Sequence, residues 1–213
     1  MTNNNKSYVI VLGRQFGCGA RVIGKKLAEA LGIPYYDKEL LHEAAKESGV
    51  NAEYIAANDE RSPSVASSLW SFNLGFGSTS YMIGSSTFNG DNVYKAQCDV
   101  IKQLAAQGPC VIVGRTADFI LRDICNVISI FIHASIDDRI NRIIDRGDCD
   151  NEDQARELAI KHNKARAGYY NFYTDRTWGA ADNYDLAINA SPLGIDATVD
   201  AIEAYVRRRL GSI

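Results

Sequence analysis

Residues 8–31 read YVIVLGRQFGCGARVIGKKLAEAL. An apolar run typical of a buried strand leads into a loop with three glycines, and a stretch with helical spacing of its apolar residues follows at once. The glycines allow backbone turns that a Cβ would block. The amides of such a loop can converge on an anion, and the N-terminus of the next helix adds partial positive charge. The stretch therefore predicts a phosphate-binding loop at the start of an α/β domain.

The loop differs from the standard phosphate-binding motif G-x-x-x-x-G-K-[ST]. Five residues separate Gly13 from Gly19, and Ala20 stands where the lysine is expected. Arg21 occupies the position of the serine or threonine. We predict that Arg14 or Arg21 supplies the missing cation, because a guanidinium binds phosphate oxygens in a bidentate fork. The alternative is a tight strand–helix turn without a role in phosphate binding.

The composition of the 213-residue chain fits one domain with a sizeable core. A net charge of −3 does not fit a nucleic-acid-binding surface, which is normally basic. The five cysteines form no C-x-x-C pair, so they indicate neither a zinc site nor a disulfide framework. No apolar run has the length of a membrane span, and the N-terminus lacks the apolar core of a signal peptide. We expect reduced thiols, a cytoplasmic location and no membrane partner.

Short apolar runs predict the strands of a parallel sheet that is covered on both faces, with helical stretches between them. The predicted strands are Tyr8–Leu12, Ile33–Tyr36, Cys110–Val113, Val127–Ile132 and Leu186–Asn189. Strands that alternate with helices indicate an α/β fold with right-handed crossovers.

The interval 62–90 carries no charged residue and is dense in serine, glycine and aromatic residues. It is too apolar for a plain disordered linker. Two interpretations stay open: an insertion packed on the surface, or a lobe that folds over a substrate or against a second chain. A homo-oligomer is therefore one of the open arrangements.

Several segments together resemble the cytidylate kinase-like family, a branch of the P-loop nucleoside monophosphate kinases. They read GRQFGCGARVIGKKLAEALGIPYYDKELL, VIVGRTADFIL, FIHASIDDRINRI, ARAGYYNFYTDRTWG and NYDLAINAS. The resemblance covers nearly the whole chain apart from the serine-rich interval. It implies one domain over residues 1–213 with a three-layer P-loop fold and a five-stranded parallel sheet in the order 2-3-1-4-5. It further implies that 62–90 is an insert in a helical monophosphate-binding lobe and that 146–180 forms the lid.

The resemblance also implies a donor site in the glycine loop and an acceptor site at the ends of neighbouring strands. The donor residues are Gly13, Gln15, Gly17, Cys18, Gly19, Ala20 and Arg21. On the acceptor side, Asp37 follows the second strand, Arg115 belongs to a Gly-Arg motif, and Asp185 belongs to a Tyr-Asp-Leu motif. Thr116 stands where that Gly-Arg motif continues with Asp in cytidylate kinases.

Phosphoryl transfer between two polyanions needs cations on several sides of the transferred group. Arg139, Arg142 and Arg146 share one face of a predicted helix, where their alternative role is a solvated face paired with nearby aspartates. We predict Arg14, Arg21, Arg146 and Arg166 as the catalytic cations, the last two from the lid. The histidines show no ligand spacing, so no metal site of protein ligands is predicted, and Mg²⁺ is expected to arrive with the nucleotide phosphates.

These residues predict an enzyme that transfers the γ-phosphoryl group of ATP to a nucleoside monophosphate, nominally CMP or dCMP. A second hypothesis is a kinase for another small-molecule acceptor, because Thr116 replaces the expected aspartate. A third is a protein that binds nucleotide without turnover, because Ala20 replaces the lysine that stabilises the transition state.

Overall fold

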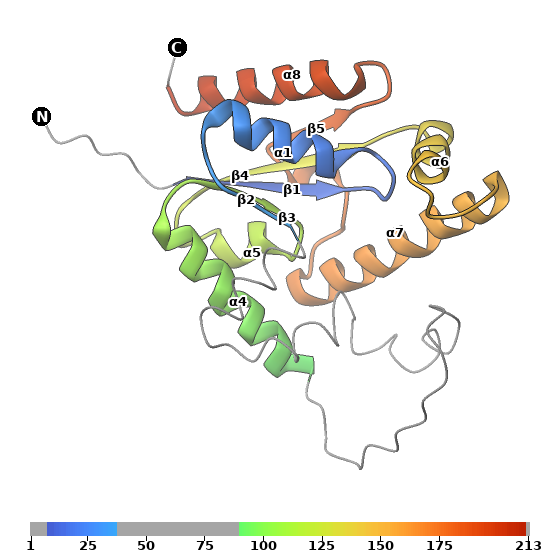
Figure 1. The fold of residues 1–213 in the computed structure, drawn as a ribbon. Coiled ribbons are helices and arrows are strands. Elements are labelled where there is room, and N and C mark those ends of the chain that lie inside the picture. The colour runs from blue at the N-terminus through green and yellow to red at the C-terminus, as the bar shows by residue number, and fades with distance from the viewer. Residues whose placement is uncertain (1–7, 38–89, 212–213) are drawn as a thin grey trace, which may run out of the picture.

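Five parallel strands form one sheet in the order β2-β3-β1-β4-β5 (Figure 1). The computed structural model describes residues 8–37 and 90–211. The strands are β1 (Tyr8–Arg14), β2 (Tyr35–Tyr36), β3 (Cys110–Val113), β4 (Asn126–His133) and β5 (Leu186–Asn189). The sheet confirms the predicted α/β fold and the predicted strand order 2-3-1-4-5.

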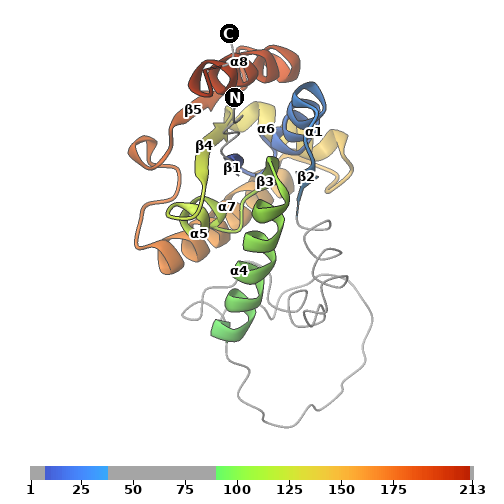
Figure 2. The same ribbon diagram turned by 90° about the vertical axis from the view of Figure 1, so that its left-hand side faces the viewer.

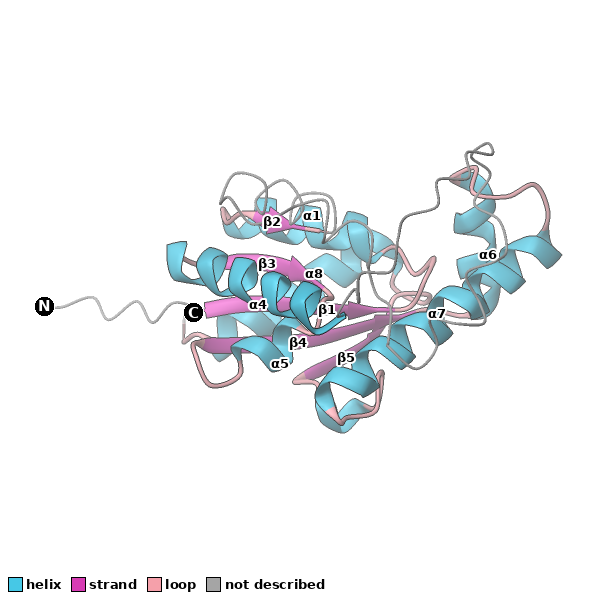
Figure 3. Ribbon diagram, turned by 90° about the horizontal axis from the view of Figure 1, so that it is seen from below, coloured by secondary structure: helices cyan, strands magenta, loops and turns pink. Residues whose placement is uncertain are grey.

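Helices cover both faces of the sheet, which makes three layers (Figure 2). Helices α1 (Ala20–Leu31) and α8 (Gly194–Arg209) pack side by side on one face. Helices α4 (Gly90–Gln107) and α5 (Ala117–Leu121) lie on the other. Helices α6 (Ile136–Asp145) and α7 (Glu152–Thr174) lie beyond the carboxyl ends of the strands (Figure 3), and the short 3₁₀ helix η1 (Ala181–Asn183) precedes β5.

The central strand β1 explains why the first apolar run does not alternate with polar residues. Ile10 and Leu12 are fully buried in the core beneath α1 and α8. Val9 and Val11 are equally buried in a second core beneath α4 and α5. Because the strand is covered on both faces, its successive residues from Val9 to Leu12 are all buried in apolar environments.

Most of the predicted insert, 62–89, lies outside the described residues, and Gly90 begins α4. In the predicted lid region 146–180, the described backbone consists of a short turn, the long helix α7 and a loop that leads to η1. Within the described ranges we find no helical segment that combines the length and the apolar character needed to cross a bilayer.

Candidate phosphoryl-transfer site

The glycine loop between β1 and α1 is a tight turn that packs closely against neighbouring helices. Gly17 and Gly19 have φ angles of 81° and 87°, in the left-handed region that favours glycine. A Cβ on Gly17 would lie 2.8 Å from the backbone oxygen of Arg139, and one on Gly19 would lie 2.5 Å from Cδ1 of Ile195. Gly19 is the N-cap of α1 and no side chain caps it. The amino end of α1 thus has no side-chain cap, and anion binding there stays a prediction.

Helix α7 contacts the glycine loop through hydrogen bonds and a stacked pair of rings. The amide of Phe16 donates to Oδ1 of Asn163 at 2.8 Å, and the Phe16 ring stacks on His162 with centroids 4.2 Å apart. Nη1 of Arg166 donates to the carbonyl of Arg14 at 3.2 Å. These contacts join residues about 150 positions apart in sequence. For that reason, the sequence pattern did not predict that Asn163 and His162 contact the loop. The predicted lid helix therefore helps to shape the loop itself.

A pocket at the carboxyl ends of β1 and β3 brings together three of the predicted arginines, Arg14, Arg115 and Arg166. Arg115 is buried, with 6% of its surface exposed. The pocket is also lined by Asp118 and by the aromatic side chains of Tyr169, Tyr170, Trp178 and Tyr184. Guanidinium groups from a strand end, a loop and a lid helix thus converge on one place, as anion recognition requires.

The backbone after β3 is strained where it forms the wall of this pocket. Gly114, Arg115 and Thr116 have φ angles of 77°, 63° and 53°, so three successive residues adopt the left-handed conformation. Each such non-glycine residue costs on the order of 1–3 kcal/mol and persists only where the surroundings hold it. The Arg14 guanidinium occupies the space that a Cβ on Gly114 would need. The missing side chain at position 114 therefore admits the Arg14 side chain to the pocket.

Thr116 holds this strained turn in place. Its hydroxyl donates to the carbonyl of Arg115 at 2.6 Å and lies 3.0 Å from the hydroxyl of Tyr94 on α4. Burial raises the pKa of Tyr94 to about 12, so its hydroxyl keeps its proton at neutral pH. Thr116 is itself only 2% exposed. Thr116, which replaces the expected aspartate, therefore has a structural role.

Asp118 is a carboxylate of the pocket that the sequence did not single out. It is 8% exposed and accepts a hydrogen bond of 2.8 Å from the hydroxyl of Tyr170 on α7. Burial is the main cause that raises the pKa of Asp118, and burial likewise raises the pKa of Tyr170. The only signal in the sequence is an acidic residue within the otherwise apolar segment Ala117–Leu121.

We expect the stability of the Asp118→Asn variant, relative to the wild type, to increase with pH. A carboxyl with a raised folded-state pKa stabilises the folded state fully below its unfolded pKa, and this contribution is lost as pH rises through the folded pKa. Asparagine does not titrate, and its Oδ1 can still accept from Tyr170. Thermal melts from the acidic side of the ordinary Asp range up to neutrality measure this difference. A Tm difference that stays constant over that range would contradict the raised pKa. Asp123→Asn, at a carboxylate whose side chain is 80% exposed, is the control.

Arg21 and Asp37 form an ion pair with each other. Nε of Arg21 lies 3.0 Å from Oδ2 of Asp37, whose side chain is 8% exposed while that of Arg21 is 57% exposed. Asp37 follows β2, so this pair joins the first turn of α1 to the edge of the sheet. Neither residue lines the pocket of Arg14, Arg115 and Arg166.

Arg146 ends α6, where its guanidinium pairs with Asp148. Its Cζ lies 5.1 Å from the centre of the Phe16 ring, so the side chain also reaches the glycine loop from outside. About half of the Arg146 side chain is exposed. The structure thus brings this predicted lid arginine to the loop but does not place it in the pocket.

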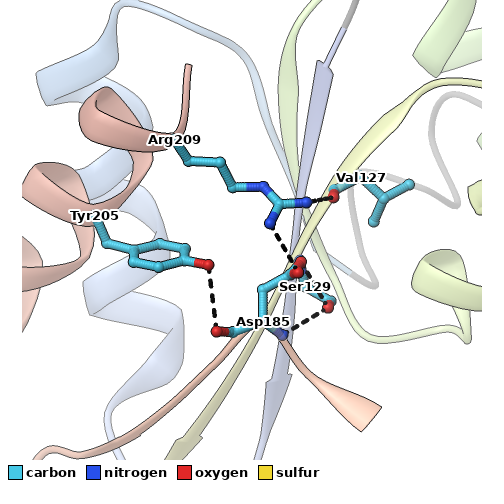
Figure 4. Close-up of polar contacts among 5 residues, drawn as sticks. All are labelled: Val127, Ser129, Asp185, Tyr205 and Arg209. Carbon is cyan, nitrogen blue, oxygen red and sulfur yellow. Dashed lines mark hydrogen bonds and ion pairs between the residues drawn. The ribbon is translucent and has the colours of Figure 1, made fainter. Parts of the chain in front are cut away.

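Asp185 lies elsewhere, in a cluster that joins β4, β5 and α8 (Figure 4). Its Oδ2 accepts from the amide and the hydroxyl of Ser129 at 2.8 and 3.0 Å, and its Oδ1 lies 3.0 Å from Nη1 of Arg209. The Tyr205 hydroxyl donates to its carbonyl at 3.2 Å. We expected Asp185 in an acceptor site at the ends of neighbouring strands. It precedes β5 and stands at the amino end of that strand, whereas the arginine pocket lies at the carboxyl ends of β1 and β3. Its role in acceptor binding stays a prediction.

We expect Asp185→Asn to lower stability and to leave the acceptor KM unchanged, because both carboxylate oxygens already have protein partners. Loss of the ion pair with Arg209 should cost about 0.5–1.5 kcal/mol in the free energy of unfolding. Denaturant unfolding and acceptor titrations measure the two effects, and Arg209→Gln should reproduce the loss of stability. A raised acceptor KM with unchanged stability would instead support direct contact with the acceptor.

The described residues contain no group of three His, Cys, Asp or Glu side chains placed to hold a metal ion. The cationic groups of the site are the guanidinium groups of Arg14, Arg115 and Arg166, which suit phosphate oxygens.

Comparisons with known proteins bear on the fold and the family of the chain. The chain is similar to an uncharacterized protein from Eubacterium ventriosum, with 29% identity, a TM-score of 0.69, and coverage of 94% of this chain and 98% of that one. A shikimate kinase from Bacteroides thetaiotaomicron shares the fold at 14% identity and a TM-score of 0.53, over 96% of this chain and 98% of that one. A gluconokinase from Sinorhizobium meliloti does so at 16% identity and a TM-score of 0.52, over 97% of each chain.

No curated protein matches the chain. The two solved kinases show that its fold is that of P-loop kinases. The model of one family matches residues 9–192, which include the glycine loop, the arginine pocket and α7. The chain belongs to the cytidylate kinase-like family.

Proposed function

We propose that this P-loop kinase transfers the γ-phosphoryl group of ATP to a nucleoside monophosphate, nominally CMP or dCMP. One observation carries the proposal: Arg14, Arg115 and Arg166 converge on a pocket at the carboxyl ends of β1 and β3. In open α/β sheets, ligands bind in the crevice at these strand ends. Three cations in one pocket suit an acceptor that carries a phosphate of its own.

The donor phosphates would lie in the loop formed by Gly13, Gln15, Gly17, Cys18, Gly19, Ala20 and Arg21. Left-handed turns at Gly17 and Gly19 leave the amino end of α1 open toward the phosphates. Mg²⁺, when bound with the nucleotide, would neutralise phosphate charge. No protein carboxylate is assigned to hold it.

Arg115 would bind the acceptor phosphate, while Arg14 and Arg166 would flank the transferred group. Arg166 donates to the carbonyl of Arg14, so α7 and the carboxyl end of β1 would stay together beside the transferred phosphoryl group. Such an arrangement lowers the barrier by positioning two polyanions and by neutralising charge that spreads in the transition state. Asp37 contributes on the acceptor side, and Arg21 and Arg146 add positive charge at the edges of the loop.

A second acceptor class is favoured by one observation. The Thr116 hydroxyl is engaged with Tyr94 and with the Arg115 carbonyl, so it does not replace the missing aspartate as a contact to ribose or base. An acceptor without a nucleoside would need no such contact. The second candidate is therefore a kinase for another small phosphorylated or hydroxylated molecule.

A coupled assay of ADP release across a panel of acceptors tests both candidates. The panel should include CMP, dCMP, the other nucleoside monophosphates and small alcohols with and without a phosphate. Acceleration by CMP or dCMP well above the rate with water alone supports the first candidate. A preference for a non-nucleoside acceptor supports the second. If no acceptor accelerates ADP release, the kinase proposal is wrong and nucleotide binding without turnover takes its place.

A further inference from the structure

Helix α6 brings two arginines against the glycine loop. The position of a Cβ on Gly17 lies 3.1 Å from Cβ of Arg139, and that of a Cβ on Gly19 lies 3.9 Å from Nε of Arg142. The two arginines are one helical turn apart, so their side chains project from the same face of α6. Each arginine therefore packs against one of the two left-handed glycines that shape the loop.

The Arg139 side chain is buried without the partners that a charged group normally has. Arg139 is 9% exposed, and among the described residues its Nε and Nη1 have no hydrogen-bond partner. Nη1 of Arg142 is likewise buried and unpaired within residues 8–37 and 90–211. Burial lowers the pKa of Arg139, yet a guanidinium stays protonated in proteins. Burying an unpaired charge is costly, so a bound anion would relieve a penalty that the folded chain otherwise carries.

The surroundings of the pair are basic. Burial raises the pKa of the Cys18 thiol, in the middle of the loop, while an amide hydrogen bond and the charges of Arg166, Arg14 and Arg142 oppose that rise. Cys18 also acts on Arg139, so both α6 arginines lie within electrostatic reach of the loop. Of the acidic residues of α6, Asp137 pairs with Arg156 at 3.8 Å. Hydrogen bonds from Ser191 and Ser135 lower the pKa of Asp138, and the charge of Arg142 adds to that effect.

We propose that Arg139 and Arg142 form a donor-phosphate subsite, in which α6 supplies the positive charge that Ala20 cannot. The inference rests on the proposed function and deepens it, because it names the groups that replace the lysine of the standard loop. Arg21, the other candidate beside Ala20, is held by Asp37 and its side chain is more than half exposed. Arg14 and Arg166 line the pocket on the acceptor side. Arg146 reaches the loop at the Phe16 ring, with its guanidinium paired to Asp148, whereas Arg139 and Arg142 lie against the loop glycines themselves.

Equilibrium binding by the full chain tests this subsite without requiring turnover. The probes are inorganic tripolyphosphate and the series AMP, ADP and ATP, and the variants are Arg139→Gln, Arg142→Gln and the control Arg156→Gln on α7. Each of the first two should weaken tripolyphosphate and ATP binding by at least about 10-fold, the loss of one charged hydrogen-bonding group. The loss should grow from AMP to ATP, which a purely structural defect would not produce. Arg156→Gln should bind as the wild type does.

The proposal is overturned if Arg139→Gln and Arg142→Gln bind tripolyphosphate as tightly as the wild type. Should Arg139→Gln fail to fold, Arg142→Gln alone decides, with wild-type affinity again overturning the proposal. Arg139→Lys, which keeps the charge, should recover part of the affinity. Weakened binding in a protein that shows no phosphoryl transfer would support the subsite and contradict the proposed function. If the wild type is an active kinase and both variants still bind tripolyphosphate as tightly as it does, the subsite is wrong and the proposed function stands.

Discussion

Replacing Gly19 with valine should lower the affinity for ATP by at least about 100-fold, or about 2.7 kcal/mol. Gly19 has a φ of 87°, which a β-branched residue avoids, and its Cβ would lie 2.5 Å from Cδ1 of Ile195. The backbone must therefore move, and the amides at the start of α1 would no longer converge on the phosphates. Calorimetric titration with ATP measures the loss.

Gly32→Val is the matched control for this substitution. Gly32 caps the other end of α1 with a φ of 65°, and no atom lies within 4 Å of its Cβ position. The backbone penalty is of the same kind, roughly 1–2 kcal/mol, but it falls far from the loop. Gly32→Val should therefore lose stability and keep its ATP affinity. Equal affinity losses in both variants would show that the effect of Gly19→Val is global.

Replacing Arg115 with glutamine should lower kcat/KM for the acceptor by about 100- to 1,000-fold, the usual effect of removing one preorganised donor. Arg115 is buried in the pocket, and its backbone is held in the left-handed region by the Thr116 turn. Glutamine keeps most of the length of the side chain but loses the charge and the guanidinium fork. Acceptor titrations at saturating ATP measure the change.

ATP affinity should stay nearly constant in the Arg115→Gln variant, because the donor loop is a separate segment of backbone. Arg122→Gln, at an arginine after α5 that pairs with the neighbouring Asp123, should change neither parameter. A large loss of ATP affinity in Arg115→Gln, with unchanged acceptor kinetics, would place Arg115 on the donor side and contradict the site.

The parallel strands could be predicted because they follow from local patterns. Arg14, Arg115 and Arg166 were each named from the sequence, but the pocket that they share was not predicted. Fully apolar runs indicate buried parallel strands, and residues at the carboxyl ends of such strands meet at one edge. The resemblance to a family supplied the order of strands. Strand bounds were less accurate: β2 consists of Tyr35–Tyr36 alone, because the residues before it form the connection from α1.

The partners of Asp185 could not be predicted, because Ser129 and Arg209 come close to it only in the folded chain. Asp118 and Asn163 escaped notice altogether. Their roles depend on tertiary contacts: Asp118 meets Tyr170 across 52 residues, and Asn163 meets Phe16 across 147. Nothing in the local pattern of α6 separates Arg139, which is buried against the loop, from an arginine on a solvated face.

The most direct test of the account follows the phosphoryl group itself. The full chain is incubated with ATP labelled at the γ-phosphate and with CMP or dCMP, and the products are separated. We expect label in the nucleoside diphosphate, with transfer lost in Gly19→Val and strongly reduced in Arg115→Gln. Label that appears only as inorganic phosphate, at the same rate with and without acceptor, would contradict it.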